Sequence, residues 1–198
     1  MSGAARAMRK RSSQLLAALD APGSDKDLLR AVRAAIEHVR GRPVRLRAVA
    51  FPPDVASGLW IDRTTHDVIA YEEQTDLDHQ LVIIGHEVWH MLEGHCGSLT
   101  GHGAATRSQQ DRAGLQAVVA AISEADAAEL PLMEQMDAGL HIALRADDPS
   151  VIHQEEEAEF FGYKFATAVR DEVAAARSLA DPEHLAGRIQ LSMGMRRF

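Results

Sequence analysis

The chain has 198 residues, of which 46% are hydrophobic and 25% charged, an ordinary composition for a folded protein with one core. Its single cysteine, Cys96, excludes an intrachain disulfide, and its apolar runs, such as residues 81–84, are far shorter than the roughly 20 residues of a membrane helix. The N-terminus shows no secretory pattern. These features predict a cytoplasmic protein.

Charge is spread unevenly along the chain. The net charge is −8, yet residues 1–47 hold eleven Lys and Arg residues against four Asp and Glu residues. A basic segment of this kind can bind nucleic acid or an acidic partner. We expect it instead to pack on the acidic remainder of the chain, because no aromatic or glycine pattern supports a nucleic-acid site.

The first half of the chain predicts helices followed by a small antiparallel sheet. Residues 1–24 are interpreted as a basic helical lead segment, and a second helix extends from a cap at Ser24 or Asp25 to Gly41. Alternating or apolar runs then predict three short strands. They lie at residues 44–50, 59–61 and 68–71.

The second half is expected to be mainly helical. Helical patterns occur at residues 75–94, 109–147 with a break at Pro131, 151–179, and a short stretch after Pro182. Residues 95–108 are glycine-rich and are interpreted as a loop. No repeat or domain boundary is visible, so residues 1–198 are predicted to form a single α+β domain.

The helix near the middle of the chain carries two distinct faces. Thr75 and Asp78 resemble a capping box at its start, and Gly94 ends it. A core-facing stripe at helical spacing comprises Leu77, Leu81, Ile84, Val88 and Met91 or Leu92. His86 and His90 lie one turn apart on the opposite side.

Residues 86–90 read His-Glu-Val-Trp-His, a His-Glu-x-x-His motif. Two imidazoles at i and i+4 can bind one tetrahedral zinc ion, and the Glu between them can take a proton from a water on that ion. We therefore predict one zinc ion per chain, held by His86 and His90, with Glu87 as general base. The alternative is a core helix whose histidines merely form hydrogen bonds.

A third zinc ligand is expected from the helix at 151–179. Its stripe of small and acidic positions comprises Glu155, Ala158, Glu159, Gly162 and Ala166. Small residues would let this helix approach the histidine helix, so that Glu155 reaches the metal and Glu159 accepts a hydrogen bond from a ligating histidine. Glu156 is intermediate and Glu157 points to the other side. The alternative is that these glutamates form a solvated face.

Other histidines fit the site less directly. A three-histidine metzincin site would need Gly at position 93 and His at position 96, which are Glu93 and Cys96. In a continued helix, His95 would point toward the apolar stripe. His79, two turns before His86, is a candidate hydrogen-bond partner near the site or a helix N-terminal residue.

Several short motifs resemble those of the ImmA/IrrE-type metallopeptidases, within them an actinobacterial group described as toxin components. The resemblance covers most of residues 25–170. It rests on Gly41-Arg42-Pro43, Gly58-Leu59-Trp60, Tyr71-Glu72, His79-Gln80, Ile84-Gly85-His86-Glu87, His90, Gly94-His95 and Glu155-x-Glu157-Ala158-Glu159. It implies a gluzincin-like minimal zincin domain, with Glu155 as third ligand and Glu87 as base.

The chain departs from that family at three positions. Glu159 stands where Asn or Asp is common, and Gly162 where Ala is common. Trp89 replaces the usual Gly before the second histidine, which puts bulk on the helix and could alter substrate access. The first two departures leave the ligand set intact but loosen the assignment of Glu159.

The resulting hypothesis is a zinc-dependent metallo-endopeptidase. The resemblance implies regulatory proteolysis of a protein partner, such as a helix-turn-helix repressor or a neighbouring regulator. An extended substrate is expected to add to the sheet edge at residues 68–71. Candidates for stabilising the oxyanion are His153, Tyr71, His102 and Tyr163.

Two alternatives to this hypothesis stay open. One is a non-catalytic zinc-binding module with a regulatory or toxin-like role, and the other is nucleic-acid binding through residues 1–47. Retention of Glu87 favours the enzyme, because a structural metal site has no use for a base.

Overall fold

The computed structural model describes residues 3–22, 24–51, 56–95, 114, 117–122, 124 and 149–180. The helices are α1 (Gly3–Ala18), the 3₁₀ turn η1 (Asp25–Asp27), α2 (Leu28–Arg40), α3 (Leu77–Glu93) and α5 (Pro149–Ala180). The strands are β1 (Val44–Val49), β2 (Gly58–Asp62) and β3 (Asp67–Glu72). The protein is therefore mainly helical with one small sheet, as expected for the α+β class.

The sheet is mixed, so the expectation of an antiparallel sheet is wrong. Its order is β1-β3-β2, in which β2 and β3 form an antiparallel hairpin while β1 pairs with β3 in parallel. Pro52 and Pro53, which follow β1 in the sequence, lack the N–H donors of a tight hairpin. The next strand, β2, lies on the far side of β3 from β1. Because β3 is central, residues 68–71 are not the edge that was expected to receive a substrate.

Both faces of the sheet are covered, which explains why β3 is buried along nearly its whole length. One face packs on a larger core shared with the helices, to which the strands contribute Val44, Trp60, Ile69 and Tyr71. The other face forms a second core with the helical residues 117–122. Its buried members are Phe51, Leu59, Ile61, Val68, Ala70, Val118, Val119 and Ile122.

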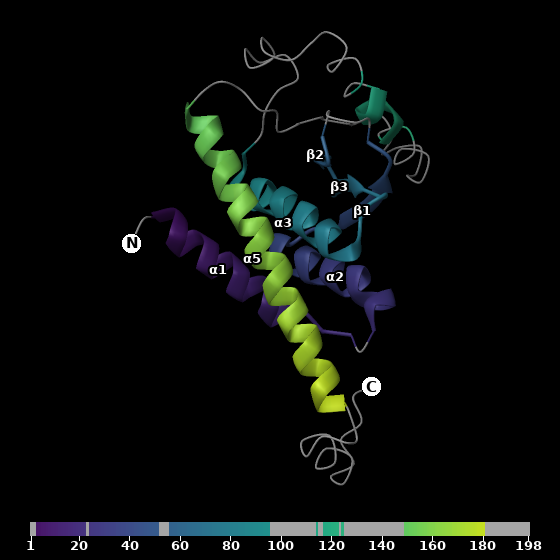
Figure 1. The fold of residues 1–198 in the computed structure, drawn as a ribbon. Coiled ribbons are helices and arrows are strands. Elements are labelled where there is room, and N and C mark those ends of the chain that lie inside the picture. Colours follow the sequence, from purple (N-terminus) through teal and green to yellow (C-terminus); the bar gives the residue numbers. More distant parts are fainter. Residues whose placement is uncertain are drawn as a thin grey trace.

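Helix α3 lies between the sheet and α5, as Figure 1 shows. Its predicted stripe is confirmed, since Leu81, Ile84, Val88 and Met91 are all buried in the larger core. Gly94 ends the helix in the left-handed conformation at φ 71°, as predicted. The start differs by one residue, because the side chain of Asp76 rather than Thr75 accepts the N–H of His79.

Helices α1 and α2 complete the larger core. α1, the basic lead segment, buries Met8 and Leu15 there, and its Arg11 donates to Glu93 at 3.0 Å and to the carbonyl of Leu92. The segment thus packs on the body of the protein. α2 ends at Gly41 with φ 77°, as the sequence predicted, but starts after η1 rather than at a Ser24 or Asp25 cap.

Several predictions fall outside the described residues. They are the loop at 96–108, most of the helical stretch 109–147 with its break at Pro131, and the stretch after Pro182. In the part of the chain that is described, no helix is both long enough and apolar enough to span a membrane.

Candidate metal centre

α3 brings the two motif histidines together. One turn of helix separates His86 from His90, and their Nε2 atoms lie 3.1 Å apart. His90 is 2% exposed, whereas the side chain of His86 is 19% exposed. The pair therefore has one ring in the core and one reaching the surface.

α5 brings a carboxylate to the same point. Glu155 places Oε2 at 3.6 Å from the Nε2 of His86 and Oε1 at 3.6 Å from the Nε2 of His90. Potential ligand atoms of all three residues lie within 4.8 Å of one another. Among the residues that the structure describes, this is the one group of three or more His, Cys, Asp or Glu side chains that meets that criterion.

The spacing of these atoms fits a zinc ion. Ligands about 2.0–2.2 Å from a tetrahedral metal lie about 3.3 Å from each other, close to the observed 3.1 and 3.6 Å. Two imidazoles and one carboxylate are also a donor set that zinc takes in catalytic sites. His86, His90 and Glu155 could therefore hold the metal.

The protonation of His90 supports the same reading. Burial, together with the neighbouring rings of His86 and His95, lowers the pKa of His90 to about 3. A neutral imidazole forms no ion pair with Glu155, but it is the form that binds a metal. The 3.1 Å contact between His86 and His90 could instead be a hydrogen bond. A hydrogen bond between the two rings would not explain why the carboxylate of Glu155 lies beside them.

Glu87 lies beside this group in a buried position. It is 6% exposed, and its carboxylate accepts a hydrogen bond from the backbone of Trp60 on β2. Burial raises the pKa of Glu87 to about 8, and the charge of Glu155 acts in the same direction. The carboxylates of Glu87, the candidate base, and Glu155, the candidate ligand, are therefore close enough to interact electrostatically.

The close crossing of α3 and α5 depends on two glycines. A Cβ on Gly162 would lie 2.6 Å from the carbonyl oxygen of Val82, and one on Gly85 would lie 3.0 Å from the Cα of Gly162. No larger residue fits at either position without moving a helix. The small-residue stripe of α5 therefore faces α3, as the sequence indicated, and delivers Glu155 to the histidines.

Other candidates on α5 are not among the three converging ligand residues. Glu159 is exposed one turn beyond Glu155. Glu157 is half-buried rather than solvated, with its Oε1 3.0 Å from the Nε2 of the exposed His153. The structure brings none of these three into the group of metal-ligating atoms.

The remaining candidates that the structure describes are His79, Tyr71 and Tyr163. His79 is exposed in the first turn of α3, where Asp76 accepts its backbone N–H. Tyr71 is buried in the larger core, and Tyr163 is exposed on α5. His102 lies outside the described residues.

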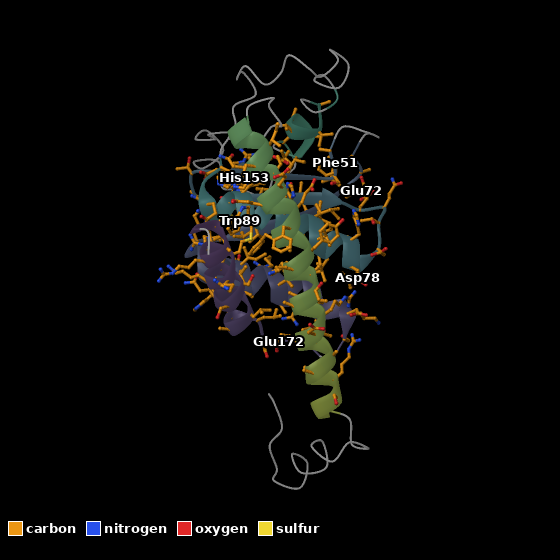
Figure 2. All side chains as sticks on the ribbon, turned by 60° about the vertical axis from the view of Figure 1, so that its left-hand side comes forward. Phe51, Glu72, Asp78, Trp89, His153 and Glu172 are labelled. Carbon is orange, nitrogen blue, oxygen red and sulfur yellow. The ribbon has the colours of Figure 1, made fainter. Side chains whose placement is uncertain are left out.

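Trp89 turns away from the surface instead of narrowing access to the site. Its ring packs 5.0 Å from that of Phe161 and is almost wholly buried. Figure 2 shows it below His153, level with the upper part of α5. The expectation that Trp89 could alter substrate access is therefore not supported, because its bulk fills the core between α3 and α5.

His95 lies next to His90, a position that the sequence analysis did not predict. Its ring lies 5.6 Å from that of His90, although a continued helix would have pointed it to the apolar stripe. The left-handed turn at Gly94 redirects the chain, and the N–H of His95 donates to the carbonyl of His90. Gly94 could have indicated this position in the sequence, because a glycine that ends a helix changes the direction of the chain at the residue that follows.

Comparisons of the chain with protein-family models, curated proteins and solved structures give no match. The function is therefore inferred from the geometry of this cluster and its neighbours.

Proposed function

We propose that the protein is a zinc-dependent endopeptidase, with zinc held by His86, His90 and Glu155. The observation that carries this proposal is the convergence of three donor atoms beside the buried carboxylate of Glu87. Among the described residues the cluster offers three ligands rather than four. Three protein ligands with one open position are typical of catalytic zinc sites, whereas structural sites are closed by four.

The chain's own residues would divide the chemistry between binding and proton transfer. When bound, zinc supplies a Lewis acid that polarises a carbonyl and makes water more acidic. Glu87 would take a proton from the attacking water and return it to the leaving amine. Burial raises the pKa of Glu87, and a carboxyl group with a raised pKa holds a proton more readily, which suits its return to the leaving amine.

The kind of substrate follows from two further features. β2 is the strand beside Glu87, and within the described sheet it pairs on one side only, with β3. An extended peptide could pair with the part of its other side that Glu87 does not occupy. The motifs shared with ImmA/IrrE-type metallopeptidases support regulatory cleavage of a specific protein, such as a repressor or neighbouring regulator.

Glu87→Gln separates an enzyme from a binding module. Gln keeps the size and can still accept the Trp60 hydrogen bond but cannot take a proton, so zinc binding and folding should persist while cleavage falls by about 10²–10⁴. The assay compares zinc-loaded wild type and variant on an adjacent regulator. Glu156→Gln is the matched control, since Glu156 is exposed outside the cluster.

Two outcomes of this assay would count against the enzyme. Equal cleavage by the zinc-loaded variant would remove Glu87 as the base. Binding without cleavage by both proteins, across several candidate partners, would favour the non-catalytic zinc module.

A further inference from the structure

We infer that Gly58 is a positioning residue for Glu87: the outer edge of β2 is shaped to hold that carboxylate beside the metal cluster. The inference rests on the proposed function, because it concerns how the candidate base is oriented. It assigns a role to a strand residue that is neither a ligand nor a proton-transfer group.

The space at Gly58 is filled by Glu87. A Cβ atom built on Gly58 would lie 2.7 Å from Oε1 and 3.1 Å from Cγ of Glu87, and 2.6 Å from Cγ2 of Ile83. Real Cβ atoms essentially never approach other heavy atoms within 3.0 Å. Since the φ angle of Gly58 is not positive, the backbone does not require glycine there. The close approach of Glu87 does.

The register of the hairpin explains why the carboxylate finds a donor at this edge. The carbonyl of Ser57 accepts the N–H of Glu72 on β3, so Ser57 directs its backbone groups toward that strand. Backbone groups alternate along an antiparallel strand, and those of Gly58 and Trp60 therefore point away from β3. The outward N–H of Trp60 is the one that Glu87 accepts.

This donor is itself held in place. The indole Nε1 of Trp60 donates to Asp67 at 2.8 Å, and Asp67 also accepts Arg40 and Arg42 at 2.8 Å each. Trp60 is almost wholly buried. The N–H of Trp60 is thus a fixed donor, and the absence of a side chain at Gly58 lets Glu87 reach it.

A methyl group at position 58 should move the carboxylate rather than the metal ligands. The atoms nearest to the added Cβ belong to Ile83 and Glu87, and none belongs to the histidines or Glu155. The Oε1 of Glu87 is the end of a flexible side chain, so it yields before the backbone of β2 does. Gly58→Ala is therefore expected to retain zinc and to misplace the base.

A double-mutant cycle between Gly58→Ala and Glu87→Ala tests the inference. The probe is acetohydroxamate, which chelates zinc and donates a hydrogen bond to an adjacent carboxylate. In zinc-loaded protein, Gly58→Ala should weaken probe binding about tenfold or more, the loss expected for one hydrogen bond to a charged group. In the Glu87→Ala background the same change should have no effect. Zinc affinity, measured by competition with a chelator, should stay within about threefold of wild type.

Two control variants accompany this test. Gly58→Ala/Ile83→Ala removes the contact with Ile83 and should show the same loss of probe binding, whereas Gly3→Ala, with nothing within 4 Å, should show none.

Two results of the probe assay would overturn the inference: equal weakening of probe binding with and without Glu87, or no weakening at all. The same cycle in urea unfolding of the zinc-free protein should show coupling between positions 58 and 87, and its absence would also overturn the inference. Wild type that binds no zinc would instead refute the proposed function.

Discussion

Gly162 approaches α3 so closely that a Cβ atom there would lie 2.6 Å from the carbonyl oxygen of Val82. Because this oxygen belongs to the backbone, α5 would have to move, and Glu155 would move with it. Gly162→Ala should therefore weaken zinc binding by about tenfold and lower the free energy of unfolding by about 1–3 kcal/mol, the usual cost of overpacking.

The sign of that stability change is informative. In an unhindered helix, replacing Gly by Ala stabilises a protein by about 0.4–1 kcal/mol. Gly3→Ala at the first residue of α1, which has open space around it, should show no such loss of stability. Chemical unfolding and a zinc competition assay measure both variants. A Gly162→Ala protein with unchanged zinc affinity would show that the crossing does not position Glu155.

Zinc stoichiometry tests the histidine pair. We expect one zinc ion per chain in wild type and loss of the metal in His86→Ala or His90→Ala, since each removes one of three converging donors. Added zinc should also raise the melting temperature of wild type, because a ligand that binds only the folded state stabilises it. His79→Ala, a change at an exposed histidine, is the control. Full occupancy in both ligand variants, measured by elemental analysis, would rule out the site.

Two glutamates on α5 provide a matched comparison for the third ligand. Glu155 lies 3.6 Å from both motif histidines, whereas Glu157 lies 3.0 Å from His153 on the flank of the cluster. Glu155→Ala should release zinc readily, and Glu157→Ala should retain it. Titration with a chromophoric chelator measures both affinities. If only Glu157→Ala lost the metal, the ligand assignment would be wrong.

The sequence predicted the parts of the site that depend on local periodicity. The stripe through Leu81 and Val88 fixed which side of α3 faces the core, and therefore the opposite side for His86 and His90. The small residues of α5 likewise indicated the face that carries Glu155. Both inferences use only the 3.6-residue repeat of a helix, which a single sequence reveals.

Features set by distant parts of the chain were not predicted. The parallel pairing of β1 with β3 depends on where the chain re-enters the sheet, and alternation of polar and apolar residues does not encode strand order. The burial of Trp89 required knowledge of its partner Phe161 on another helix. The contact between Gly58 and Glu87 joins a strand to a helix, and neither residue pattern alone indicates it.

The pH dependence of stability tests the environment of Glu87 in the zinc-free protein. Its pKa is raised from 4.5 to about 8, so between these values the folded chain binds more protons than the unfolded chain. Stability should therefore fall as pH rises through this window, by at most about 1.4 kcal/mol per pH unit. His90 acts oppositely, since its pKa is lowered from 6.5 to about 3 and its contribution rises with pH only up to about 6.5.

Of these two groups, only Glu87 contributes to the slope of stability between about pH 6.5 and 8. Glu87→Gln removes the ionisable group, so its free energy of unfolding in the presence of a chelator should gain on that of wild type as pH rises across this interval. Urea unfolding at several pH values measures the difference, with Glu156→Gln as a control expected to run parallel to wild type. Parallel curves for Glu87→Gln and wild type would mean that Glu87 is already ionised in the folded protein. Its carboxylate would then be better solvated than its buried position against β2 indicates.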